Sequence, residues 1–193
     1  MADPLWLSFP RDPDANGVLS SQPGETPQVH RQRPRQRQRR DSSMPQSLSQ
    51  VIVHLIFSTK NREPWLDAGV RPRMHAYLAT ICRDLGAEAF RVGGVADHVH
   101  LVVTLPRTLS QSGLVEEIKK LSSKWIKGLD PKYRRFYWQR GYGAFSLGRS
   151  QLDAVVKYVS EQERHHRRVS FQEEFRRVLA KYGVAFDERY VWD

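Results

Sequence analysis

Residues 95–105 read VADHVHLVVTL, a run in which apolar side chains alternate with others. Successive side chains of an extended strand point to opposite faces, so Val99, Leu101 and Val103 share one side. His98 and His100 then lie together on the other side. The segment predicts a strand with one buried apolar face and a second face that carries two imidazoles.

The flanking segments predict the rest of the architecture. Residues 51–57 are β-branched and aromatic, typical of a buried strand, and the paired glycines Gly93-Gly94 favour a tight turn between two strands. Apolar residues recur at helical spacing after Pro72 and after a cap at Ser110 or Ser112. The predicted strands span 51–57, 88–92 and 97–105, with a fourth strand or irregular edge segment at 136–138 and 142–147. The predicted helices span 72–85, 114–128, 152–166 and 171–182.

The order strand, helix, strand, strand, helix, strand is the ferredoxin-like (RRM-like) pattern of an α+β domain. It predicts an antiparallel sheet with helices on one face, in which the strands at 51–57 and 97–105 are neighbours. Two C-terminal helices follow this core. The fold hosts many functions, so the function must be argued from a site.

Composition narrows the class of protein. The formal net charge of +10 favours a polyanionic partner, either nucleic acid or an anionic membrane surface. The single cysteine, Cys82, excludes an intrachain disulfide and a cysteine-based zinc cluster, and is expected to be buried. No apolar run approaches the roughly 20 residues that cross a bilayer. We expect a cytoplasmic protein without a membrane partner.

The chain divides into three parts. Residues 1–45 are rich in proline and arginine and are expected to be disordered. They can act as a basic arm on DNA, as a solvated tail, or as sequence upstream of a true start at Met44. Residues 46–168 form the predicted domain, and residues 169–193 a C-terminal helical tail.

The histidine pair is the first candidate site. Two imidazoles two residues apart on a strand can converge on one cation, although the same pattern fits two half-exposed histidines without a ligand. His54, on the neighbouring strand, can bind the ion, orient a ligand, or be a core histidine. His165 and His166 are adjacent on a helix, where their rings point about 100° apart. We therefore expect them on the surface or facing DNA.

The helix at 152–162 carries the second candidate site. Tyr158 and Gln162 are four residues apart at the edge of an apolar stripe, so the phenol and the amide can reach the same place. The alternative is a packing tyrosine and a solvated glutamine. A tyrosine with a pKa near 10 needs a cation on the target phosphate to act as a nucleophile, and two imidazoles with an amide oxygen suit such a cation. Attack on phosphorus gives a 5′-phosphotyrosine and a free 3′-hydroxyl.

These residues resemble a known family, the HUH single-tyrosine transposases of bacterial insertion sequences with their REP-associated tyrosine transposase relatives. The resemblance covers roughly residues 45–168. The blocks that carry it are 51–60 with Arg62, 97–101, 138–146, and 158–162 followed by His165-His166.

The resemblance implies cleavage and rejoining of single-stranded DNA at imperfect hairpins near the ends of an element. It implies a metal site at His98 and His100 with Gln162 as third ligand, Tyr158 as nucleophile, and Mg²⁺ or Mn²⁺ as the ion. It also implies a dimer in which the tyrosine helix of one subunit completes the histidine site of the other, although some relatives act as monomers. The resemblance further implies a bacterial protein that is associated with the nucleoid when bound to DNA.

Basic and aromatic side chains are the candidates for holding the DNA. Phosphate contacts come from cations, and unpaired bases stack on rings. Tyr137, Trp138 and Phe145 are candidates for stacking or, slightly favoured, ordinary core residues. Tyr142, between glycines, is a competing nucleophile without a partner glutamine. The candidate DNA-binding residues are Lys60, Arg62, Lys119, Lys120, Lys124, Arg140 and Tyr142.

Two other functions fit the same residues. One is a non-catalytic module that grips single-stranded nucleic acid, such as a domesticated transposase. The other is an HUH replication initiator or relaxase. Nucleic-acid binding that does not depend on metal and is retained by Tyr158→Phe would indicate the non-catalytic module.

Overall fold

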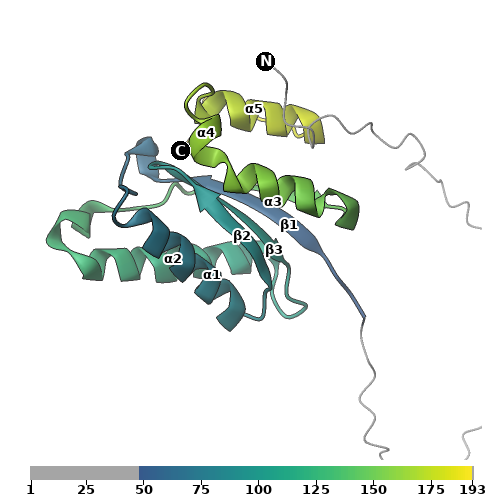
Figure 1. Ribbon diagram of the computed structural model, residues 1–193, viewed down its shortest axis with the longest axis horizontal. Helices are drawn as coiled ribbons and strands as arrows, with labels where there is room; N and C mark the ends of the chain where they lie inside the picture. The colour runs from purple at the N-terminus through teal and green to yellow at the C-terminus, as the bar shows by residue number, and fades with distance from the viewer. Residues whose placement is uncertain (1–47, 193) are drawn as a thin grey trace, which may run out of the picture. The chain divides into compact units, whose positions relative to one another are not determined.

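Four strands form one antiparallel sheet in the order β2-β3-β1-β4 (Figure 1). The computed structural model describes residues 48–192, so the predicted disordered tail at 1–45 and the start at Met44 lie outside the described residues. The predicted α+β architecture and the pairing of its first and third strands are confirmed. The strands are β1 Ile52–Ser58, β2 Ala89–Gly94, β3 His98–Thr104 and β4 Gly143–Leu147.

The pairing register between β1 and β3 determines which histidines lie close together. Ile56 pairs with His100, Ser58 with His98, and His54 with Val102. Because diagonal neighbours on one face of an antiparallel pair lie within reach of long side chains, His54 can touch His100. Three imidazoles therefore share one face of the two central strands.

Two helices, α1 (Arg71–Asp84) and α2 (Gln111–Leu129), cover the opposite face of the sheet (Figure 1). Pro72 lies in the first turn of α1, and the Ser110 hydroxyl accepts a hydrogen bond from the Gly113 amide at the start of α2. The core between these helices and the sheet is apolar. From the sheet it contains Val53, Leu55, Phe57, Val99, Leu101 and Val103.

Three further helices cover the histidine face: α3 (Leu152–Ser160), α4 (Gln162–His165) and α5 (Phe171–Tyr182) (Figure 1). A capping box between Ser170 and Glu173 begins α5, and Gly183, with a φ of 64°, ends it. A second core lies between these helices and the sheet and includes Ile56, Val102, Phe171 and Phe175. The helix α5 therefore packs on the sheet, although it lies in the segment predicted as a tail.

Two local expectations were wrong. Gly93 and Gly94 end β2 and do not form the turn, which spans residues 95–97. A Cβ on Gly93 would lie 2.3 Å from the Val159 carbonyl oxygen, so the missing side chain lets α3 cross β2 closely. The single helix predicted at 152–166 is divided at Glu161, whose φ of −100° and ψ of 14° separate α3 from α4.

The remaining connections are short. Single 3₁₀ turns occupy Lys60–Arg62, Pro131–Arg135 and Arg149–Gln151. The fourth strand is confined to Gly143–Leu147, while Trp138 makes one antiparallel bridge with Thr59. Within residues 48–192, every helix is too short or too polar to span a membrane.

Candidate active site

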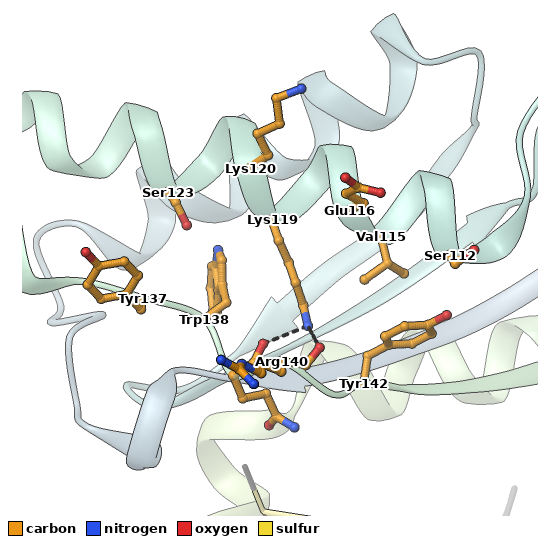
Figure 2. A pocket seen from close by; sticks show the side chains of 11 residues that line it. Ser112, Val115, Glu116, Lys119, Lys120, Ser123, Tyr137, Trp138, Arg140 and Tyr142 are labelled. Atoms are coloured by element: carbon orange, nitrogen blue, oxygen red, sulfur yellow. Dashed lines mark hydrogen bonds between the residues drawn. The ribbon is translucent and has the colours of Figure 1, made fainter.

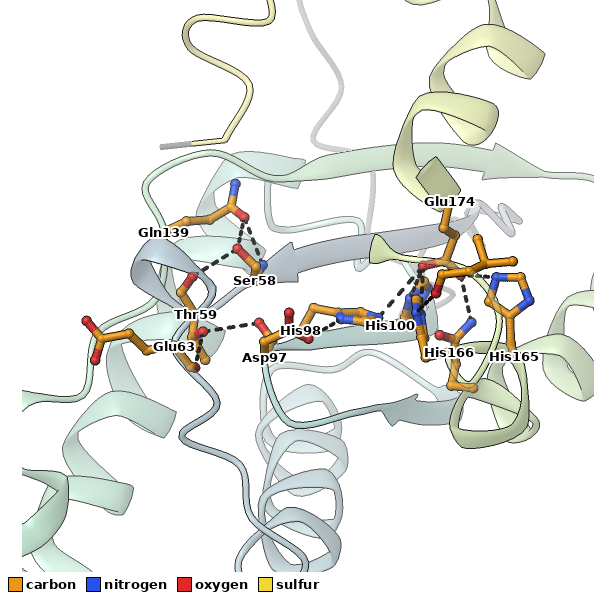
Figure 3. A network of polar contacts seen from close by, with 12 residues as sticks. Ser58, Thr59, Glu63, Asp97, His98, His100, Gln139, His165, His166 and Glu174 are labelled. Carbon is orange, nitrogen blue, oxygen red and sulfur yellow. Dashed lines mark hydrogen bonds and ion pairs between the residues drawn. The ribbon is translucent and has the colours of Figure 1, made fainter. Parts of the chain in front are cut away.

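His98 and His100 project from β3 into the second core, and both are 0% exposed (Figure 3). Nδ1 of His98 lies 2.7 Å from the Asp97 carboxylate. Because a carboxylate accepts, Nδ1 of His98 donates, and in the neutral ring the lone pair then lies on Nε2. The Nε2 atoms of both histidines are buried without a hydrogen-bond partner among residues 48–192.

His54 supports His100 from β1. Its Nε2 lies 3.0 Å from Nδ1 of His100, and the two rings stack 5.2 Å apart. Burial, with the neighbouring histidine as a second cause, holds the pKa of His54 well below its usual value. Burial also lowers the pKa of His100, with the nearby His98 adding to it. Neutral imidazoles are the form that binds metal ions, and a hydrogen bond to Nδ1 fixes which nitrogen is free.

Tyr158 lies on α3 beside these rings. Its ring centroid is 6.0 Å from that of His100 and 5.4 Å from that of His165, and the residue is 6% exposed. The phenol and the imidazole thus come together within one chain. Tyr142 packs against the apolar core of the opposite face, with the Lys119 ammonium 5.5 Å from its ring. The sheet separates Tyr142 from the histidines.

Gln162, at the start of α4, is 1% exposed. Its Nε2 donates to Oε1 of Glu174 over 2.9 Å, while its Oε1 is buried and has no hydrogen-bond partner in the described part of the chain. The break at Glu161 changes the path of the chain between Tyr158 and Gln162. Both side chains are nevertheless buried on the histidine face of the sheet.

Glu174 is the site residue that the sequence did not indicate. It comes from α5 and is 3% exposed (Figure 3). Its Oε2 lies 3.5 Å from Nε2 of His100 and 3.8 Å from Nε2 of His98. Burial raises the pKa of Glu174 to about 8.

The predicted surface position of His165 and His166 is wrong, because both side chains are largely buried. The His165 side chain is 18% exposed and that of His166 is 10% exposed. Nε2 of His166 lies 3.1 Å from Oε2 of Glu174, and Nδ1 of His166 lies 2.8 Å from the Val169 carbonyl oxygen. Burial lowers the pKa of His166 to about 3. The turn after α4 brings both rings against Glu174.

The donor atoms gathered here fit a divalent metal ion. One atom each from His98, His100, His166 and Glu174 lies within 4.8 Å of the other three. Imidazole nitrogens and carboxylate or amide oxygens are the mixed donors that first-row divalent ions accept. The buried Nε2 atoms without partners provide an independent sign, because buried polar atoms ordinarily have a hydrogen-bond or metal partner.

A basic surface lies on the other side of the sheet. A cavity of about 370 Å³ is bordered by α2 and the segment 137–142, and includes Lys120, Arg140 and Tyr142 (Figure 2). An adjoining cavity of about 390 Å³ includes Lys60 and Arg140. Lys124 is exposed on α2 and Arg62 is half-buried near Lys60.

The aromatic candidates divide by exposure. Trp138 and Phe145 are 7% and 3% exposed and belong to the two cores, whereas Tyr137 is 54% exposed. The Lys127 ammonium lies 3.6 Å from the Tyr137 ring. Tyr137 is therefore the aromatic of this group that is open to a base.

Lys119 has a structural task. Its ammonium donates to the carbonyl oxygens of Gln139 and Arg140 over 3.0 and 3.3 Å (Figure 2). It also donates to the carbonyl oxygen of Gly141 over 2.7 Å. Burial lowers the pKa of Lys119 to about 8. The side chain thus supports the loop that carries Arg140, and its predicted direct contact with DNA stays a prediction.

A model of the family described as IS200-like transposases matches residues 47–162. The chain belongs to the IS200-like transposase family. The family resemblance that the histidine, tyrosine and glutamine blocks predict is confirmed.

Two curated relatives of this transposase have the same description. The transposase for insertion sequence element IS200 of Salmonella typhimurium is 25% identical over 118 residues, which are 58% of this chain and 78% of that protein. The IS200 transposase of Salmonella typhi matches with the same identity and coverage.

Solved structures also resemble this transposase. A crystal structure of a candidate transposase from Deinococcus radiodurans aligns with a TM-score of 0.49 and 19% identity, covering 63% of this chain and 97% of that one. A REP-associated tyrosine transposase bound to a REP hairpin aligns with a TM-score of 0.48 and 19% identity, covering 65% and 74%.

Proposed function

We propose that this IS200-like transposase cuts and rejoins single-stranded DNA at hairpin-flanked element ends through a 5′-phosphotyrosine link at Tyr158. The observation that carries the proposal is the position of the Tyr158 ring, 6.0 Å from the ring of His100 on the same sheet face. The Nε2 atoms of the neighbouring imidazoles have no hydrogen-bond partner among the described residues. Phosphoryl transfer to a tyrosine needs a phenol beside groups of this kind, which can activate it or hold a cation.

The chemistry conserves phosphodiester energy. The Tyr158 oxygen attacks phosphorus and loses its proton, the bond from phosphorus to the 3′-oxygen breaks, and the departing 3′-oxygen gains a proton. In the second step a 3′-hydroxyl attacks phosphorus and loses its proton, the bond from phosphorus to the Tyr158 oxygen breaks, and the departing phenolate gains a proton, which restores a phosphodiester and the free tyrosine. Neither step consumes a nucleotide cofactor.

We propose that His98 and His100 hold a divalent ion, Mg²⁺ or Mn²⁺, through their Nε2 atoms, with Oε1 of Gln162 as third ligand. Such an ion, when bound, polarises the scissile phosphate and stabilises charge in the transition state. Asp97 and His54 orient the two imidazoles through their Nδ1 atoms. Tyr158 is only 6% exposed, so little water reaches the phenol.

The proposed DNA path uses the basic surface near Arg140. Lys60, Lys120 and Arg140 border the two cavities, and Tyr142 borders the first. Lys124 and Arg62 extend this surface, and Lys119 supports its loop. These contacts are with phosphates and rings, so we expect binding that weakens steeply with salt.

Two wider expectations accompany the proposal. The resemblance implies a dimer with the tyrosine exchanged between subunits, whereas the cis position of Tyr158 supports a site completed within one chain. Sedimentation with and without hairpin DNA distinguishes these arrangements. The cytoplasmic, nucleoid-associated location also stays a prediction, to be examined by imaging a tagged chain.

The test is a covalent adduct. The protein is incubated with labelled single-stranded DNA that contains an element end and with Mg²⁺ or Mn²⁺, then run on a denaturing gel. We expect an adduct with the wild type and none with Tyr158→Phe. Tyr77→Phe is the matched control, since it removes one hydroxyl on the opposite face, where the Tyr77 ring stacks on Trp125 outside the proposed DNA path, and it is expected to retain the adduct.

The same assay distinguishes the other functions. DNA binding without an adduct, unaffected by metal and by Tyr158→Phe, would overturn the enzyme and indicate a binding module. An adduct on origin DNA, with none on element ends, would indicate an initiator or relaxase.

A further inference from the structure

We propose that Glu174 and His166 are metal ligands of this transposase, so that the C-terminal helix α5 supplies a carboxylate to the histidine site. The proposal rests on the proposed metal site at His98 and His100 and extends it to residues beyond the family match, which ends at residue 162. The ligand it assigns to these residues is a divalent cation.

Hydrogen-bond partners determine where the lone pairs point. Nδ1 of His166 lies 2.8 Å from the Val169 carbonyl oxygen, which only accepts, so Nδ1 carries the hydrogen. Nε2 of the neutral His166 ring then presents its lone pair to Oε2 of Glu174, 3.1 Å away. Asp97 imposes the same tautomer on His98. Lone pairs that face one another at such distances require a cation or a proton between them.

The spacing fits one ion. Around an octahedral ion with bonds of about 2.1 Å, neighbouring ligand atoms lie about 3.0 Å apart and opposite ones about 4.2 Å apart. Oε2 of Glu174 lies 3.1 Å from His166, 3.5 Å from His100 and 3.8 Å from His98 at their Nε2 atoms. All four donors lie within 4.8 Å of one another, so the shell closes with movements of less than about 1 Å.

The carboxylate of Glu174 and the ring of His98 are each held in place by a neighbouring side chain. Nε2 of Gln162 donates to Oε1 of Glu174 over 2.9 Å, which leaves Oε2 for the histidines. Phe171, one turn earlier on α5, stacks on the His98 ring with centroids 4.4 Å apart. A hydrogen-bonded carboxylate next to oriented imidazoles is the usual setting of a protein metal ligand.

One alternative uses the same contacts without metal. A protonated Glu174 can donate to Nε2 of His166 and fill the place of the ion. Removal of the carboxylate charge then distinguishes the two cases, because a ligand strengthens metal binding and an occupant of the metal position weakens it.

The experiment titrates the full chain with Mn²⁺ in the absence of DNA and follows free Mn²⁺ by its electron paramagnetic resonance signal. We expect one tight site in the wild type. We expect Glu174→Gln to weaken it by at least about 10-fold, the effect typical of perturbed metal surroundings. His166→Gln is expected to weaken it as well.

Glu173→Gln is the matched control, because Glu173 is exposed on the same helix and glutamine retains its capping role. We expect wild-type Mn²⁺ affinity for it. Melting curves followed by circular dichroism establish that each variant folds before it is titrated, and His166→Gln provides a second variant should Glu174→Gln unfold.

Equal or tighter Mn²⁺ binding by Glu174→Gln and His166→Gln would overturn the inference. If His98→Ala alone abolishes binding in that case, the proposed function stands with the smaller ligand set. If the wild type neither binds Mn²⁺ nor forms the DNA adduct, the proposed function itself fails.

Discussion

The two faces of the sheet differ in what they bury. The face toward α1 and α2 buries apolar side chains such as Leu55 and Leu101, both 0% exposed. The face toward α3 and α5 buries His54, His98 and His100 to the same extent, with Gln162 and Glu174 nearby. Both sets come from alternate positions of β1 and β3.

The strands β1 and β3 contribute both to stability, through their apolar face, and to the candidate active site, through their histidine face. Burying polar groups costs free energy unless they find partners, so the histidines on one face depend on the apolar side chains around them, such as Ile56 and Val102, and on the wholly apolar strand residues of the other face. Because side chains alternate along a strand, a residue of the candidate active site and a residue of the apolar core are neighbours in sequence. Substitutions at neighbouring positions should therefore affect either DNA cleavage or stability.

The largest effect is expected on the histidine face. His100→Ala should lower DNA cleavage by about 10³-fold or more, because loss of the metal removes several kcal/mol of transition-state stabilisation. Single-turnover cleavage of labelled DNA measures it. Cleavage within 10-fold of wild type would break the comparison.

The neighbouring residue should affect stability instead. Leu101→Ala is expected to lower the free energy of unfolding by about 2–5 kcal/mol, the cost of a cavity in an apolar core. Urea denaturation measures this value for both variants. The effect of His100→Ala on unfolding should be smaller, and the reverse order would contradict the division between the faces.

Gly93 links the two properties. Gly93→Ala places a methyl group against the Val159 carbonyl, one residue from Tyr158, so α3 must move. We expect a loss of about 1–3 kcal/mol of stability, as in overpacked cores, together with reduced adduct formation.

Gly128→Ala is the control for that substitution. Gly128 lies in the last turn of α2, where a Cβ meets nothing within 4 Å. We expect it to be neutral or stabilising by up to about 1 kcal/mol, with cleavage unchanged. Equal melting temperatures and cleavage rates for the two alanine variants would argue against a tight crossing at Gly93.

The smallest effect is expected on stability in acid, through Asp67. Hydrogen bonds from the Val70 amide, then from Lys132, Tyr133 and the Gly69 amide, lower the pKa of Asp67 to about 2. Since the pKa in the folded state is below that in the unfolded state, this stability is present above about pH 4 and is lost as the pH falls toward 2. Asp67→Asn should flatten this loss in urea midpoints measured from pH 5 to pH 2. Parallel curves for Asp67→Asn and wild type would contradict the assignment.

Sequence reasoning succeeded where the pattern is local. The alternation at His98 and His100 and the cap at Ser110 depend on residues close in sequence, so their spacing determines the geometry. The placement of Tyr158 beside the sheet follows from the apolar stripe of its helix and from the family blocks.

The missed features depend on tertiary contacts. Glu174 is 74 residues from His100 in sequence, a contact that no spacing rule predicts. His165 and His166 become part of the site because the chain turns at Glu161 and α5 folds back over the sheet. Gly93 reads as a turn residue because the approach of α3 is not visible in the sequence.

The most direct test of the whole account is to locate the DNA on the protein. The wild type is trapped on a single-stranded substrate with Mn²⁺, digested with trypsin, and examined by mass spectrometry. The account predicts nucleotide mass on the peptide that contains Tyr158, which trypsin separates from the peptide with Tyr142 at Arg149. Nucleotide mass on Tyr142, or a cleaved substrate with no modified tyrosine, would contradict it.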